Sequence, residues 1–253
     1  MNRRNIRLFS VFHKEYPTPN CDWITPIQAG RRHAPIVLPM IHDDMGSASI
    51  SDKNDRFCEL TALYWIWQNL DNFDEEYIGL VHYRRYFYFP CALPIHTHYI
   101  SADFLNEAIT DVQLWQYIAE QLDADKLIVP IPTPFSHAGF NVKSQYIFAH
   151  DEADWHLLEN TLIHTHPDYQ TAFSEFSGMD SMFGYNMFIG SKNFVQQYCA
   201  WLFPILFAME PHIAHKKDVY QNRVFGFMAE RLLNVYILHH QIPTSMLPVL
   251  QFP

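Results

Sequence analysis

Three cationic side chains, His82, Arg84 and Arg85, follow directly on a short apolar run, Ile78–Val81. The run is too short for an ordinary helix and turn-type residues precede it, so we predict a buried strand. Ligands of open α/β sheets bind beyond the carboxyl ends of the strands, and guanidinium groups match phosphate oxygens. The pattern therefore indicates a phosphate site. Pairing of these cations with an internal carboxylate is the alternative that the residues leave open.

A second group of basic residues follows another short apolar segment. Ile24–Ala29 is typical of a strand and is followed at once by Gly30, Arg31 and Arg32. Taken alone, we interpret these arginines as the polar residues of a solvated loop. If the loop lies beside the segment that carries His82, however, its arginines would join the same anion site.

Two adjacent carboxylates, Asp43 and Asp44, stand in a polar stretch. Paired carboxylates can hold a divalent ion, Mn²⁺ or Mg²⁺, on a nucleotide diphosphate. Adjacent aspartates in a turn rich in Gly and Ser are more commonly turn and capping residues. We therefore predict no dedicated metal site, and we keep Asp43 and Asp44 as the candidates should a metal bind.

Two further polar residues stand where they need partners. Asn186 lies in the middle of an apolar stretch, Phe183–Gly190, that we predict to be a strand. An amide buried in a strand must find hydrogen-bond partners, so Asn186 is either a structural cross-link or a ligand contact. His150 beside Asp151 would suit a general base with an orienting carboxylate, but we favour a solvated surface pair.

The spacing of apolar residues predicts the elements that position these side chains. Besides the strands above, we predict strands over Ile6–His13 and Leu127–Val129. We predict helices over Arg56–Leu70, Ser101–Ile109, Val112–Leu122, Val142–Leu162, Pro167–Phe176, Lys192–Met209 and Tyr220–His239. This order predicts an α/β fold in which a mixed, mostly parallel sheet is flanked by helices. We expect one domain over residues 1–253, with the sheet in about 5–90 and 126–190 and a helical part in 191–240.

Composition excludes several classes of protein. With 253 residues, 49% of them hydrophobic, the chain can bury a full core, and its net charge of −10 argues against nonspecific binding of nucleic acid. The sequence contains no run of eighteen apolar residues, so we predict no transmembrane helix. The four cysteines match neither a zinc nor a disulfide spacing, so we expect reduced thiols and a cytoplasmic protein.

Segments spread over nearly the whole chain resemble one known family. The ordered set resembles the bacterial capsular-polysaccharide and lipopolysaccharide glycosyltransferases long catalogued as a domain of unknown function. The match is weaker over about Cys91–Met179. The segments are His13–Glu15, Pro26–Gly30, Asp43–Gly46, Ile50–Asn54, Phe57–Trp67, Tyr77–Phe87, Tyr185–Ile189, Val224–Phe227 and Glu230–Asn234.

The resemblance implies a GT-A-like, Rossmann-type hexosyltransferase. Its donor would be a nucleotide sugar, commonly UDP-linked galactose or galactofuranose, and its acceptor a growing capsule or lipopolysaccharide glycan, free or lipid-linked. GT-A enzymes commonly carry an Asp-x-Asp metal motif after a central strand, where this chain has His82-Tyr83-Arg84. That departure fits cationic side chains, in place of a metal, neutralising the departing diphosphate.

The implied reaction assigns roles to residues. We assign stabilisation of the leaving group to Arg84 and Arg85, with His82 assisting. The residues expected to contact the nucleotide sugar are Gln28, Gly30, Arg31, His82, Arg84 and Asn186. We also expect the loop Pro130–Gly139 to close over the donor.

An inverting reaction needs a base that accepts the proton of the acceptor hydroxyl. We predict Asp180, because it shortly precedes the stretch that carries Asn186. His150, Asp44 and Glu59 are the alternatives, and Glu59 is otherwise the internal partner of Arg84 or Arg85.

Two other functions compete with glycosyl transfer. One is a non-catalytic protein that binds nucleotide or carbohydrate in a polysaccharide assembly complex. The other is a metal hydrolase built on Asp43, Asp44 and histidines. With a lipid-linked acceptor, we expect peripheral contact with the inner face of the membrane, to which Arg3, Arg4 and Arg7 would contribute.

Overall fold

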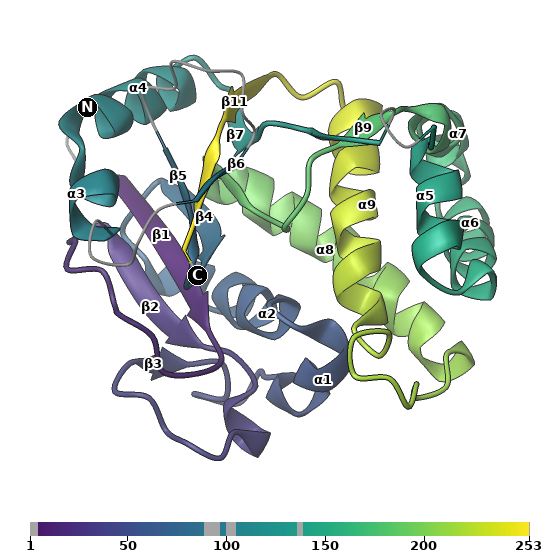
Figure 1. Cartoon of the computed structure of the whole chain (residues 1–253), viewed down its shortest axis with the longest axis horizontal. Helices are drawn as coiled ribbons and strands as arrows, with labels where there is room; N and C mark the ends of the chain where they lie inside the picture. Colours follow the sequence, from purple (N-terminus) through teal and green to yellow (C-terminus); the bar gives the residue numbers. More distant parts are fainter. Residues whose placement is uncertain (1–4, 89–96, 100–104, 136–138, 253) are drawn as a thin grey trace.

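The computed structural model describes residues 5–88, 97–99, 105–135 and 139–252, and its centre is a β-sheet with helices on both faces (Figure 1). Within these residues the main sheet has ten strands. They are β1 Ile6–Phe12, β2 Ile24–Gln28, β3 Ile41–His42, β4 Tyr77–His82, β5 Arg85–Phe87, β6 Thr97–Tyr99, β7 Leu127–Pro130, β10 Phe188–Ser191, β11 Thr244–Leu247 and β12 Val249–Gln251. A separate pair consists of β8 Thr133–Pro134 and β9 Ser181–Met182.

The strand order β11-β7-β10-β4-β1-β2-β3 confirms the predicted mixed, mostly parallel sheet. The central strand β4 pairs in parallel with β1 and antiparallel with β10. Strand β7 is also antiparallel to β10, and it is parallel to β11. The carboxyl ends of β1, β2, β4 and β7 therefore share one edge with the amino end of β10. A ligand crevice is expected at that edge.

Close packing around β4 explains one glycine of the sheet. Five of the six residues of β4 are buried. A Cβ atom at Gly79 would lie 2.6 Å from the side chain of Leu8 on β1 and 2.9 Å from that of Ile189 on β10. Only glycine lets the three strands approach this closely.

Alternate residues of the strands pack into two separate layers of core. The helices of the described residues are α1 Asn54–Phe57, α2 Leu60–Gln68, α3 Leu105–Thr110, α4 Val112–Asp123, α5 Val142–Ala149, α6 Glu152–Thr165, α7 Gln170–Gly178, α8 Lys192–Met209 and α9 Val224–His239. Phe9 and Val11 of β1 face a core completed by α2, α8 and α9, whereas Ile6 and Leu8 face a core completed by α3 and α4.

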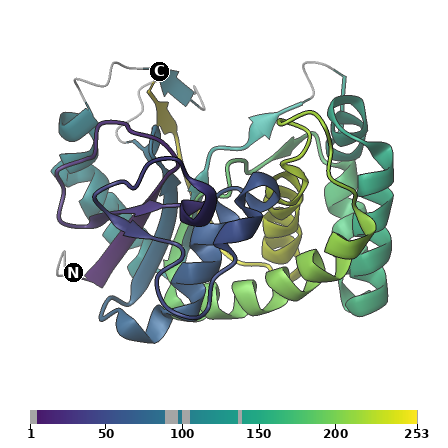
Figure 2. The ribbon, with the colours of Figure 1, turned by 90° about the horizontal axis from the view of Figure 1, so that it is seen from below.

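Helix α9 separates the sheet from α5, α6 and α7 in Figure 1, and Figure 2 shows α8 extending from the sheet toward those helices. The helical part therefore includes α5–α7 as well as the predicted 191–240 region. Within the described residues, no helix has both the length and the apolar character needed to cross a membrane. Residues 89–96, 100–104 and 136–138 are not among the described residues. These include Cys91, Ser101 and the tip of the predicted loop Pro130–Gly139.

Two predicted helices are each broken in two. The helix predicted over Arg56–Leu70 is interrupted at Cys58, whose φ is +51°. The helix predicted over Val142–Leu162 ends at Ala149, and Asp151 caps α6 by accepting a hydrogen bond from the Ala153 amide. Apolar periodicity continues through both breaks, which is why the sequence predicted neither of them.

The predicted strand over Phe183–Gly190 was wrong in its first half. Strand β10 begins only at Phe188. Tyr185 and Asn186 instead form a turn with φ angles of +70° and +52°, in the left-handed region that residues other than glycine rarely adopt. Asn186 therefore lies before a strand rather than within one.

Candidate functional site

A cavity of about 850 Å³ lies at the carboxyl edge of the sheet and extends to the helical part. The sheet contributes its ends and turns, α1 and α2 contribute the break between them, and α9 contributes its first turns. The residues that line this cleft are Val11, His13, Ala29, Asn54, Asp55, Cys58, Glu59, His82, Tyr83, Arg84, Arg85, Thr133, Phe135, Gln145, His150, Met182, Gly184, Tyr185, Lys216, Val219, Tyr220, Asn222, Arg223, Phe227, Glu230 and Arg231.

Arg84 and Arg85 reach the cleft from the tight turn between β4 and β5. The buried ring of Tyr83 and the hydrogen bond from its amide to the Val11 carbonyl hold this turn. The Arg85 guanidinium lies 4.8 Å from the Tyr185 ring centroid, and its Nε donates to Gln251. Within the described residues, no carboxylate oxygen lies within 4.0 Å of either guanidinium. Their charge is therefore available to an anion.

Arg223 is a third guanidinium in the cleft, and the sequence did not identify it. It stands immediately before α9, where the helix dipole also favours an anion. Its Nε donates a hydrogen bond to Cys58 Sγ at 3.2 Å. Its one signal in the sequence is that it directly precedes the matching segment Val224–Phe227.

His82 lies in the lining of the cleft, and its imidazole also contacts the turn at Tyr185. Its Nε2 donates a hydrogen bond to the backbone carbonyl of Tyr185, which sets the tautomer. Burial lowers the pKa of His82, although the carboxylate of Glu59 opposes this shift. The hydrogen bond holds the Tyr185 turn against β4.

Asn186 joins three parts of the molecule. Its Nδ2 donates to Glu59 Oε1 at 2.6 Å and to the Gly226 carbonyl of α9 at 3.1 Å. Its Oδ1 is buried and has no hydrogen-bond partner among the described residues. Left-handed backbone at a non-glycine residue persists only where surrounding contacts impose it, and such strain concentrates at functional sites.

Among the described residues, Glu230 is one of three carboxylates in the lining of the cleft, with Asp55 and Glu59. Its Oε1 accepts a hydrogen bond from the Tyr185 amide at 2.8 Å, and its Oε2 accepts one from Arg231 at 3.0 Å. Burial raises the pKa of Glu230; the Arg231 guanidinium opposes this rise and the Glu59 carboxylate adds to it. A half-buried carboxylate with a raised pKa in a cleft is suited to proton transfer.

The loop residues predicted to contact the nucleotide sugar lie next to residues that line the cleft. Gln28 is buried, and its side chain donates to the Ile36 carbonyl and accepts from the Leu38 amide. At Gly30, where φ is +67°, a Cβ atom would lie 2.4 Å from the side chain of Asn54, which lines the cleft. Gln28, Gly30 and Arg31 are not among the lining residues themselves.

Asp43 organises these loops. It is fully buried, and its carboxylate accepts four hydrogen bonds, from Gly30 N, Arg31 N, Ser51 Oγ and Thr61 Oγ1. Two donors on each oxygen use its acceptor capacity, so this carboxylate does not fit a metal. Asp44 pairs with His42 at 2.6 Å. Among the described residues, no three His, Cys, Asp or Glu side chains form a group that could hold an ion.

Asp180, the predicted base, is exposed and does not line the cleft. Its backbone carbonyl accepts a hydrogen bond from the amide of Phe135, which does line the cleft. Asp151 does not orient His150: the carboxylate of Asp151 pairs with Lys216, and His150 Nδ1 meets Gln221 Oε1 at 3.0 Å.

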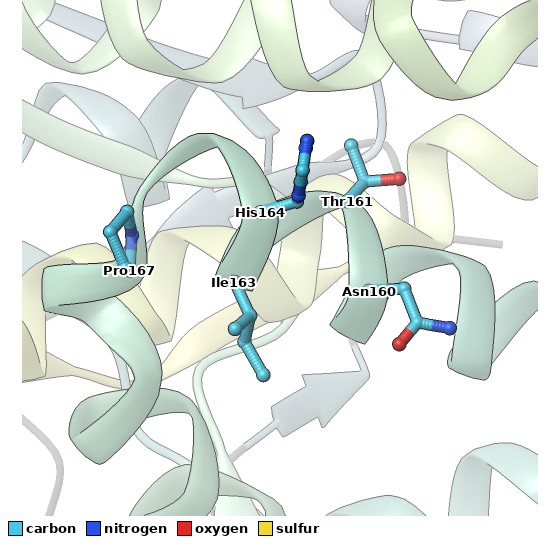
Figure 3. Close-up of a pocket in the computed structure, with 5 residues that line it drawn as sticks. All are labelled: Asn160, Thr161, Ile163, His164 and Pro167. Carbon is cyan, nitrogen blue, oxygen red and sulfur yellow. The ribbon is translucent and has the colours of Figure 1, made fainter.

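A second hollow, of about 580 Å³, lies at the C-terminal end of α6 and the turn that follows it (Figure 3). It is lined by Asn160, Thr161, Ile163, His164 and Pro167. His164 is the one titratable side chain among these five, so the hollow lacks the paired charges of the cleft.

Comparison with known proteins agrees with this architecture. The structure is similar to one titled "WbbM bifunctional glycosytransferase apo structure", with a TM-score of 0.84 and 24% sequence identity. The similarity covers 98% of this chain and 45% of that one, so the chain spans less than half of that structure's length. No curated protein is similar enough in sequence to match. Residues 7–241 match the family described as "Domain of unknown function (DUF4422)", and the chain therefore belongs to that family.

Proposed function

We propose that this protein is a glycosyltransferase that moves a hexose from a UDP-sugar, such as UDP-galactose or UDP-galactofuranose, to a glycan of the bacterial capsule or lipopolysaccharide. The observation that carries the proposal is the cleft at the carboxyl edge of the sheet, with three guanidiniums, those of Arg84, Arg85 and Arg223, free of carboxylate partners within the described residues. The fold shared with a glycosyltransferase supports it.

The three guanidiniums would hold the diphosphate of the donor. Arg84 lies in the turn after β4, Arg85 is the first residue of β5, and Arg223 stands directly before α9. When the bond from the sugar to the diphosphate breaks, negative charge grows on the leaving group, and fixed cations stabilise that charge. This arrangement neutralises the diphosphate without a metal, so no step is assigned to one.

Glu230 is the base that the geometry favours. It lines the cleft, whereas Asp180 does not. Its two oxygens each accept one hydrogen bond from the described protein groups, from Tyr185 and from Arg231, so each retains a lone pair. Glu59 is the second choice, because its carboxylate already accepts the short hydrogen bond from Asn186.

We place the reaction in the cytoplasm, at the inner face of the membrane when the acceptor is lipid-linked. Of the three arginines expected to contact the membrane, Arg3 and Arg4 lie outside the described residues. Arg7 forms an ion pair with Glu75 at 2.8 Å, which leaves it less available to lipid.

Calorimetric titration with UDP, with and without Mn²⁺, tests the proposal. We expect UDP to bind in the absence of metal and UDP-sugars to be hydrolysed slowly without an acceptor. If UDP binds neither with nor without Mn²⁺, the protein is not a UDP-sugar transferase. Binding without turnover of any sugar in a panel of UDP-hexoses would favour a non-catalytic protein of polysaccharide assembly.

A further inference from the structure

One wall of the cleft is aromatic and takes no part in the chemistry assigned above. His150, Tyr220 and Phe227 all line the cleft. Their ring centroids are separated by 4.2 Å between His150 and Phe227, 5.1 Å between Tyr220 and Phe227, and 6.1 Å between His150 and Tyr220. Three aromatic rings thus adjoin in one continuous surface.

This surface also carries a fixed polar atom. Gln221 Nε2 donates to the Ala149 carbonyl, which orients the amide so that Gln221 Oε1 accepts from His150 Nδ1. The proton of His150 therefore sits on Nδ1, and Nε2 retains a lone pair. Burial lowers the pKa of His150, which favours this neutral form. An aromatic surface beside a hydrogen-bond acceptor suits a sugar ring, which has an apolar face and hydroxyl donors.

Helix α9 relates this surface to the proposed chemistry. Arg223, Phe227 and Glu230 are spaced by four and three residues, so they lie on one side of the start of α9. The Arg223 guanidinium lies 5.7 Å from the ring centroid of Phe227 and 5.8 Å from that of Tyr220, so the aromatic surface adjoins the cation directly. Phe227 is buried beneath this surface, whereas Tyr220 is exposed, so a sugar would stack on Tyr220, beside the guanidinium that would hold the diphosphate.

We infer that the wall formed by His150, Tyr220 and Phe227 binds the terminal sugar ring of the acceptor glycan. The inference rests on the proposed function. Tyr220 is 55% exposed and the adjoining Val219 is 83% exposed, so the wall opens to solvent. An open end suits a polymer that must extend out of the cleft, whereas the uracil base of a donor would be enclosed.

Ligand-observed NMR with methyl β-D-galactopyranoside and methyl β-D-glucopyranoside as probes tests the inference, in the presence of saturating UDP. We expect at least one glycoside to bind while UDP is bound. Tyr220→Ala should weaken that binding by about three- to tenfold, the equivalent of one aromatic stacking contact. Phe148→Ala is the matched control, because Phe148 is 76% exposed and does not line the cleft.

Three results would overturn the inference. One is that neither glycoside binds, another is that UDP displaces the glycoside, and the third is that Tyr220→Ala binds it as well as Phe148→Ala does. Displacement by UDP would assign the aromatic wall to uracil. These results differ from failure of the proposed function, which is the failure of UDP itself to bind to the unmodified protein.

Discussion

Asn186 Nδ2 donates a hydrogen bond to Glu59 Oε1 at 2.6 Å, across 127 positions of sequence. The bond links the turn before β10 to the break between α1 and α2. The carbonyl of the adjacent Tyr185 accepts a hydrogen bond from His82 Nε2, and the Tyr185 amide donates one to Glu230 Oε1. This one turn therefore contacts both Glu59 and Glu230, two of the carboxylates that line the cleft.

Replacing Asn186 should cost stability for two separable reasons. Asn186→Ala removes the donor to Glu59 and leaves the half-buried Glu59 carboxylate without this partner. We expect this loss to lower the free energy of unfolding by about 1–3 kcal/mol. Asn186→Gly removes the same donor but adopts φ of +52° without strain, so it should cost less. Urea denaturation measures both variants. Equal losses would mean that the left-handed backbone stores no strain.

Arg84→Ala should lower turnover by about 10²-fold, the loss that follows removal of one group stabilising developing negative charge. The free energy of unfolding should stay within about 0.5 kcal/mol of the unmodified value, because Arg84 is half-buried and has no carboxylate partner among the described residues. Steady-state kinetics and denaturation check the two parts.

The control for Arg84 is Arg32→Ala. Arg32 is exposed and lies 3.9 Å from Asp52, away from the lining residues of the cleft. It should keep full turnover. If Arg84→Ala instead unfolds the protein, the guanidinium is part of the fold and not of the site.

Glu230→Gln should lower turnover by about 10²–10⁴-fold, the usual contribution of a general base. A base works only when it is deprotonated, so the rate of the unmodified enzyme should fall as the pH drops through the pKa of Glu230. Burial raises that pKa, which places the fall above the ordinary carboxylate value of 4.5. A profile of kcat/KM against pH checks this. If Glu230→Gln keeps the same acidic limb, another group is the base, and Glu59→Gln identifies or excludes Glu59.

His82 should make stability depend on pH. Because burial lowers its pKa in the folded protein, the unfolded chain takes up this proton first as the pH falls below about 6.5. The free energy of unfolding should then decrease, by at most about 1.4 kcal/mol per pH unit for one proton. His82→Asn should reduce this slope between about pH 6.5 and 5. A slope equal to that of the unmodified protein would contradict the assignment.

Local patterns were sufficient to predict most of the elements. The helix predicted over Lys192–Met209 is α8 with the same ends, and the strand at Ile78 is β4. The cations that follow Ile78–Val81 line a cleft at the carboxyl edge of the sheet. Each of these features depends on residues that adjoin in sequence, because periodicity and the length of an apolar run are local properties.

The tertiary structure alone decided which polar groups act together. Glu230 lies in the cleft beside the turn at Tyr185, 45 positions away, whose amide donates to it. Asp43 accepts hydrogen bonds from loops that follow two different strands. Asp180 was favoured for its place in the chain, yet its side chain is exposed outside the lining of the cleft. Hydrogen bonds between distant segments leave no periodic trace in a sequence, since each partner is compatible with many others until the fold brings one of them close.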